Sequence, residues 1–237
     1  MDRMSEIVDR VRPATEVVPL DGTPLITTLL IAAVAVTVTP LWRALRVAVT
    51  LVHELGHAFV GVLAGRTFTG FVVRGDMSGH AVTVGPARGF GRVATTWAGY
   101  PMPAVVGAVM VLVAESGYAA VLLTTFLALL AVVITRRRSA LTILVMALTL
   151  AALGSLWWFR DDALQTHVLV GTGVVLIAGA WRHLAAVTTG PGDRGSAPAG
   201  LARLTWVPRF GGILSFAVVI GLATAGAGLT IYQGLVS

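Results

Sequence analysis

Long apolar runs separated by short polar breaks dominate this chain. The runs cover residues 23–40, 44–64, 93–113, 118–135, 140–159, 163–181 and 213–232. A helix of about 20 apolar residues is long enough to cross the hydrocarbon core of a bilayer. The pattern therefore predicts an all-α polytopic membrane protein with about seven transmembrane helices, or six if the short first run does not cross.

The break between the second and third runs has a different pattern. Residues 68–73 and 80–84 are rich in β-prone side chains, and the glycine-containing segment Arg74-Gly75-Asp76-Met77-Ser78-Gly79 separates them. Two such pieces around a turn are typical of a hairpin. We therefore expect a small β-hairpin at the membrane surface between the second and third spans.

The remaining segments define the domain organisation. Residues 1–22 mix acidic and basic side chains with scattered apolar ones, which is unlike the basic stretch and apolar core of a signal peptide. Residues 188–200 are rich in Gly, Pro and Ser, as in a linker. The sequence thus predicts a cytoplasmic N-terminal segment over residues 1–22, followed by a single integral-membrane domain over residues 23–237.

Composition supports the membrane assignment and adds an orientation. The chain is 56% hydrophobic and 12% charged, and its formal charge of +6 comes from arginine because lysine is absent. The arginines lie in the breaks between the runs, which indicates membrane orientation rather than nucleic-acid binding. Placing residues 66–92, 136–138 and 182–209 in the cytoplasm gives a cytoplasmic N-terminus and an external C-terminus. Lysine-free, Ala/Val/Gly/Arg-rich usage suggests a bacterium, and hence its plasma membrane.

Three ionisable residues interrupt the second apolar run. His53, Glu54 and His57 form the pattern His-Glu-Leu-Gly-His over residues 53–57. Residues four apart share one face of a helix, so both histidines can hold one metal ion while Glu54 reaches a water beside it. Because the chain has no cysteine, a metal must be held by His and carboxylate groups. The alternative is a pair of structural histidines hydrogen-bonded to neighbouring helices.

Three segments together resemble a known family. They are the His-Glu-Leu-Gly-His-Ala segment in an apolar helix, Asp76-Met77-Ser78-Gly79 in the predicted hairpin, and Ala98-Gly99-Tyr100-Pro101 at the next helix. The chain resembles the site-2-protease-like intramembrane zinc metalloproteases, in particular their bacterial peptidase M50B-like branch, best over residues 44–135. The resemblance implies a zinc cofactor with His53 and His57 as ligands, Glu54 as general base, and hydrolysis of membrane-embedded or membrane-adjacent peptide bonds.

A third protein ligand, which catalytic zinc usually has, is not evident from the motif. Better-known relatives supply it from a Leu-Asp-Gly or similar aspartate segment on a later helix, and no such segment follows the motif here. Asp161, beside Asp162 at the end of a later helix, is the candidate, although an interfacial charge cluster is the alternative. His167 is either a ligand or a hydrogen-bonded core residue. Glu115 and Asp76 are weaker candidates, and His80 and His183 are expected at the surface.

Two further segments have open interpretations. The glycine and prolines of residues 99–103 either distort the start of a helix near the metal or mark a simple helix entry, with Trp97 and Tyr100 as headgroup anchors. The hairpin either captures an extended substrate strand by β-addition or is a plain surface loop.

The sequence therefore predicts a zinc-dependent intramembrane endopeptidase that acts on membrane proteins within the lipid bilayer and has no nucleic-acid partner. Because the third ligand is missing, one alternative is a catalytically weak or inactive metalloprotease-like scaffold or regulator. Another is a carrier that uses the His/Glu cluster as an ion or proton relay.

Overall fold

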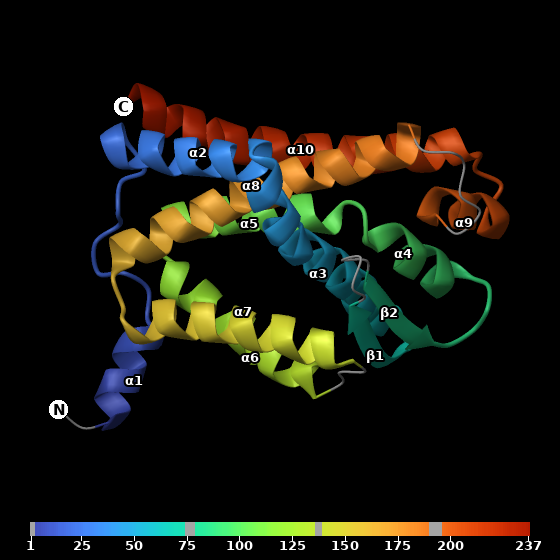
Figure 1. The fold of residues 1–237 in the computed structure, drawn as a ribbon, viewed down its shortest axis with the longest axis horizontal. Coiled ribbons are helices and arrows are strands. Elements are labelled where there is room, and N and C mark those ends of the chain that lie inside the picture. The colour runs from blue at the N-terminus through green and yellow to red at the C-terminus, as the bar shows by residue number, and fades with distance from the viewer. Residues whose placement is uncertain (1–2, 74–78, 136–138, 190–195) are drawn as a thin grey trace.

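The computed structural model describes residues 3–73, 79–135, 139–189 and 196–237. Helices make up most of this part of the chain, and one small antiparallel sheet lies beside them (Figure 1). The elements are α1 (Arg3–Val11), α2 (Gly22–Thr37), α3 (Thr39–Leu63), β1 (Thr67–Val73), β2 (Gly79–Val84), α4 (Phe90–Ala98), α5 (Met102–Glu115), α6 (Ala119–Ile134), α7 (Ala140–Trp158), α8 (Asp162–Thr189), α9 (Ala197–Leu204) and α10 (Arg209–Val236).

Each predicted apolar run forms a helix or a bent pair of helices. Among the described residues, four helices are long and apolar enough to cross a membrane, namely α3, α7, α8 and α10, and the bent pair α4 and α5 gives a fifth candidate. Helices α2 and α6 have 16 residues each. At 1.5 Å per residue they reach about 24 Å, less than the roughly 30 Å hydrocarbon core. The predicted helical membrane fold with a small hairpin is confirmed, and the length criterion supports four or five spans.

The centre of the bundle is the contact between α5 and α8. A Cβ atom at Gly107 would lie 2.5 Å from the Gly173 carbonyl oxygen, and the reverse distance is also 2.5 Å. Two facing glycines let the helix backbones approach closely, as small residues do in membrane bundles. Around them lie Val111, Val170 and Phe216, all fully buried. Helix α10 packs on α5. Helix α8 is covered by α5 on one side and by α2, which runs along it, on another (Figure 1).

The hairpin forms where the sequence predicts it and packs on α3. Its register pairs Thr67 with Val84 and Val73 with Gly79. Buried Arg66 fixes its base, since one guanidinium nitrogen donates to the Pro86 carbonyl at 2.7 Å. Residues 74–78, which include Asp76, lie outside the described residues.

A sharp bend separates α4 from α5. The two helices meet at 66° across residues 99–101, where proline removes backbone donors and distorts the helix. The indole of Trp97 donates to Ser215 Oγ at 2.9 Å, and Tyr100 stacks on Phe216 with ring centroids 5.0 Å apart. The predicted distortion is confirmed, whereas both aromatic side chains are tied to α10 rather than placed as headgroup anchors.

Both chain ends lie at the same end of the bundle (Figure 1). The Ala14 N–H donates to the Gly117 carbonyl at 2.8 Å, and Arg10 donates to the Trp158 carbonyl. Near the C-terminus, Gly234 packs against the backbone of Leu20. The N-terminal segment therefore lies beside the α7–α8 turn, which the charge pattern placed outside the cell.

The predicted orientation stays a prediction. The structure adds that the N-terminal segment and the α7–α8 turn lie on the same side, because the two are in contact. The difference from the sequence prediction arises at the first two apolar runs, which the sequence predicts to be two separate helices that cross the membrane in opposite directions. In the structure α2 begins at the end that holds both termini, and α3 continues to the opposite end at the hairpin (Figure 1).

Candidate metal centre

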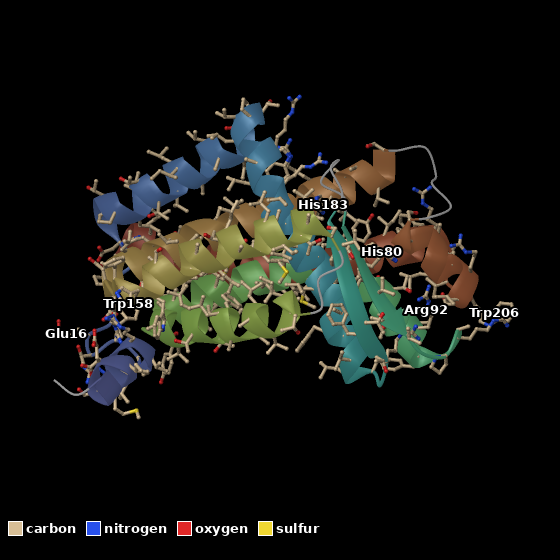
Figure 2. The ribbon with its side chains drawn as sticks, turned by 60° about the horizontal axis from the view of Figure 1, so that its bottom comes forward. Glu16, His80, Arg92, Trp158, His183 and Trp206 are labelled. Carbon is tan, nitrogen blue, oxygen red and sulfur yellow. The ribbon has the colours of Figure 1, made fainter. Side chains whose placement is uncertain are left out.

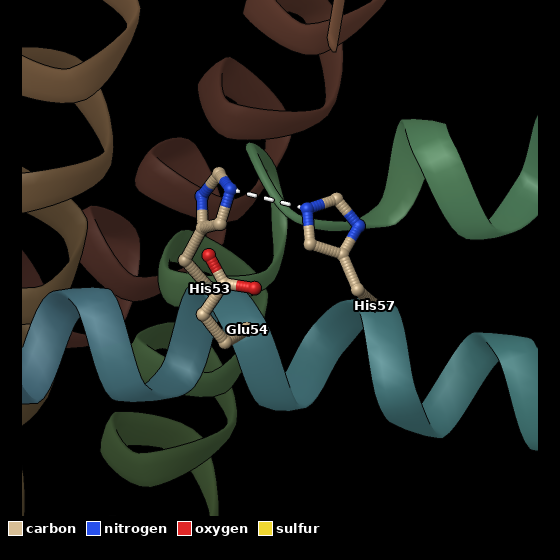
Figure 3. Close-up of side chains that lie close together, drawn as sticks. All are labelled: His53, Glu54 and His57. Carbon is tan, nitrogen blue, oxygen red and sulfur yellow. Dashed lines mark hydrogen bonds between the residues drawn. The ribbon is translucent and has the colours of Figure 1, made fainter. Parts of the chain in front are cut away.

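Helix α3 brings the two predicted histidine ligands together. His53 and His57 lie one turn apart on the same face, and their Nε2 atoms are 3.2 Å from each other (Figure 3). Glu54 completes a group in which one ligand atom from each residue lies within 4.8 Å of the others. Among the described residues, these three side chains are the one cluster of His, Asp, Glu or Cys that could hold a metal ion.

The distance between the two imidazoles fits zinc. Two nitrogens bound to one tetrahedral zinc at 2.0–2.1 Å are about 3.3–3.4 Å apart, close to the observed 3.2 Å. The same distance also fits a hydrogen bond between the rings, so it does not by itself separate a metal site from a structural pair. The surroundings of each ring provide further evidence.

His57 is oriented by the backbone of α4. Its Nδ1 atom lies 2.6 Å from the Thr95 carbonyl oxygen, and only a protonated Nδ1 can donate to that acceptor. In the neutral ring, Nε2 then carries its lone pair toward His53. A second-shell carbonyl that fixes the tautomer in this way is usual for metal-binding histidines. On His53, the buried Nδ1 has no hydrogen-bond partner within the described part of the chain.

Glu54 is held by the hairpin. Its side chain is buried, with an exposed fraction of 8%, and Oε2 accepts a hydrogen bond from the Ala81 N–H at 2.8 Å. Strand β2 passes so close that a Cβ at Gly79 would lie 2.5 Å from Glu54 Cγ. The hairpin therefore positions the carboxylate beside the histidine pair and is more than a surface loop.

A cavity of about 410 Å³ opens beside the three residues. It lies between α3, β2, the α4–α5 bend and the last turns of α8, and its polar lining includes Arg46, Thr50, Tyr100 and His183. Its volume is in the range typical of small-ligand sites. A ligand in this cavity would therefore lie against His53 and Glu54.

The candidate third ligand Asp161 lies elsewhere. Its Oδ1 accepts the Leu164 N–H at 2.9 Å at the start of α8, and neighbouring Asp162 pairs with Arg160 at 2.8 Å. Helix α8 runs from this point to His183, about 32 Å at 1.5 Å per residue, and Figure 2 shows Trp158 at one end of the bundle and His183 well away from it. The structure thus does not bring Asp161 to the histidine pair, and it fits the interfacial charge cluster.

The other candidates also lie away from the pair. His167 Nδ1 is 3.1 Å from Thr28 Oγ1 on α2, as expected of a hydrogen-bonded core residue. Glu115 is exposed at the end of α5, and His80 is exposed on β2.

His183 is the site residue that the sequence reasoning missed. It was expected at the surface, yet it is half-buried, lines the cavity, and has its ring centroid 5.9 Å from that of His53. The sixth apolar run was ended at Trp181 because Arg182 and His183 lower the hydropathy. The helix instead continues to Thr189, and its period turns His183 inward.

Comparison with known proteins decides the family. A family model described as peptidase M50B-like matches residues 26–234. The chain belongs to the peptidase M50B-like family. Searches of the curated proteins and of the solved structures found no match. The M50B-like match extends well beyond residues 44–135, where the resemblance was best, and supports membership of the site-2-protease-like group.

The close contact between β2 and Glu54 gives a first prediction for this M50B-like site. Gly79→Ala should displace the Glu54 carboxylate, and a shift of about 1 Å can lower a rate about 100-fold, so any activity that depends on Glu54 should fall by about that factor. Metal content should not change, since neither histidine is touched. The variant is compared with Gly221→Ala, where a Cβ meets nothing within 4 Å. Full activity of Gly79→Ala would show that the hairpin does not position Glu54.

Proposed function

We propose that this protein is a zinc-dependent intramembrane endopeptidase in which His53 and His57 hold the ion and Glu54 is the general base. The observation that carries the proposal is the pair of Nε2 atoms 3.2 Å apart beside the buried Glu54 carboxylate, at the wall of a cavity. Membership of the M50B-like family supports the same assignment. Burying ionisable residues in an apolar helix costs free energy, and a bound metal ion would offset that cost.

The chain's own residues provide base catalysis and orientation. Zinc, when bound, activates water and polarises the scissile carbonyl. The Glu54 carboxylate takes the proton of the attacking water and passes it to the leaving amine. The Ala81 N–H holds Oε2 so that the carboxylate stays beside the histidines through both transfers. Thr95 fixes the His57 ring through its carbonyl oxygen.

The hairpin suits an extended substrate. A transmembrane helix must unwind before cleavage, because its carbonyls are engaged in helical hydrogen bonds. Since Ala81 donates to Glu54, the outer edge of β2 runs beside the proposed base. A substrate strand added along β2 would place its backbone next to Glu54, which supports β-addition as the mode of capture.

We place the protein in the bacterial plasma membrane with its hairpin end in the cytoplasm. Arginines gather at this end, and Figure 2 shows Arg92 there and Glu16 at the other. The positive-inside rule then puts both termini outside. The substrate would be a membrane protein cut near the cytoplasmic face.

Introduced cysteines test this orientation, because the natural chain has none. Glu16→Cys and Ala87→Cys replace exposed residues at opposite ends of the bundle. A membrane-impermeant thiol reagent added to intact cells should label Glu16→Cys only, whereas Ala87→Cys should require permeabilised cells. Labelling of Ala87→Cys alone in intact cells would show that the orientation is the reverse of the proposed one. Labelling of both variants in intact cells would contradict the arrangement of the helices.

A second candidate function is an inactive metalloprotease-like scaffold or regulator. One observation favours it: in the described part of the chain, the metal-binding group contains no aspartate and no second glutamate. A scaffold would keep its fold and partners without Glu54-dependent cleavage. Any membrane substrate that is cut by the wild type and spared by Glu54→Gln would exclude this function.

A further inference from the structure

The cavity contains a third histidine, His183, which the proposed pair of zinc ligands does not include. His183 comes from α8, distant in sequence from α3, and lines the cavity together with His53 and Glu54. Its ring centroid lies 5.9 Å from that of His53, with the planes at 69°. A third imidazole thus stands beside His53, one of the two histidines of the proposed zinc pair.

The fold itself directs His183 toward His53. On α8, Gly179 and His183 are four residues apart and share one face, as do Val49 and His53 on α3. A Cβ at Gly179 would lie 2.6 Å from Val49 Cγ2, so the two helices are in close contact one turn before the histidines. Stacking of Arg182 on Trp42, with the guanidinium carbon 4.3 Å from the ring centroid, adds a contact between the same helices.

The ring spacing is close to that of a shared ion. Imidazoles that bind one tetrahedral zinc have centroids about 5.2 Å apart, given their ring size and Zn–N distances of 2.0–2.1 Å. His53 and His57 are at 4.9 Å, and His53 and His183 are at 5.9 Å. A side-chain adjustment below about 1 Å would bring His183 to that spacing from His53, which is small compared with a change of helix position.

We propose that His183 is the third protein ligand of the zinc, an inference that rests on the proposed function. Catalytic zinc usually has three protein ligands and one open position, and three histidines are an established set. This assignment leaves Glu54 as the base and not as a ligand. It also removes the main argument for an inactive scaffold, because the centre is then complete without an aspartate.

Zinc affinity of purified full-length variants tests the proposal. His183→Gln removes the imidazole but keeps a polar side chain of similar length, and His183→Glu offers a carboxylate ligand instead. His167→Gln is the matched control, since it makes the same change on the same helix at a residue bonded to Thr28. Affinity is measured in detergent by competition with a chromophoric chelator, and circular dichroism verifies the fold of each variant.

The expected affinity of His183→Gln is at least about 100-fold below the wild type, because loss of a direct ligand should exceed the 10–100-fold effect of losing a second-shell partner. His183→Glu should recover most of this loss, and His167→Gln should match the wild type. Equal affinity of the wild type and His183→Gln would overturn the inference and leave the proposed function intact. A wild type that binds no zinc would instead overturn the proposed function itself.

Discussion

Glu54→Gln is expected to lower the rate of proteolysis by orders of magnitude while the fold and the zinc content remain. Glutamine keeps the size of the side chain and one oxygen that can accept from the Ala81 N–H, but it cannot take a proton from water. General-base catalysis contributes about 10²–10⁴-fold to rates, so the rate of cleavage should fall by that factor. The histidine pair is unchanged, and zinc content should therefore equal that of the wild type.

This effect can be measured before the substrate is known. Membranes from cells that make the wild type or Glu54→Gln are compared by mass spectrometry for new peptide termini near transmembrane segments. We expect termini that are present with the wild type and absent with the variant. Glu115→Gln, the same chemical change at an exposed residue, is the control and should behave as the wild type. Identical termini with the wild type and Glu54→Gln would contradict the role of Glu54 as base.

Gly99→Ala is expected to destroy the metal site itself. Gly99 lies at the α4–α5 bend, and a Cβ there would be 2.3 Å from His57 Nε2 and 2.6 Å from His53 Nε2. Carbon atoms do not approach ring nitrogens so closely, so one or both rings must turn away. Because the new methyl group would occupy the space that both Nε2 atoms face, zinc affinity should fall at least about 100-fold, as for loss of a ligand.

Zinc content and proteolysis should be lost together in Gly99→Ala, in contrast to Glu54→Gln, which loses proteolysis alone. The matched control is Gly154→Ala on α7, where the new Cβ meets nothing within 4 Å. Circular dichroism should show similar helix content for all three proteins. Normal zinc binding by Gly99→Ala would mean that the ion is not held between the two Nε2 atoms.

Features that depend on local sequence were predictable. The His53 and His57 pair follows from the helical repeat alone, because any helix places residues four apart on one face. The hairpin follows from two β-prone pieces around a glycine-containing segment, and the bend follows from Pro101 and its neighbours. In each case the cause and the effect lie within a few residues.

Features that depend on packing between distant helices were not predictable. His183 reaches His53 only because Gly179 lets α8 approach Val49 on α3, a contact between segments more than a hundred residues apart. Asp161 looked suitable by chemistry alone, but α8 carries it to the far end of the bundle. The position of both termini at one end was not predictable for a similar reason, since nothing local shows that α2 and α3 continue toward the same end.

Elemental analysis of the detergent-purified protein tests the central claim most directly. The wild type should contain one zinc ion per chain, and the double variant His53→Ala/His57→Ala should contain none while keeping its helix content. A wild type without zinc, or a double variant with as much zinc as the wild type, would contradict a zinc centre built on His53 and His57.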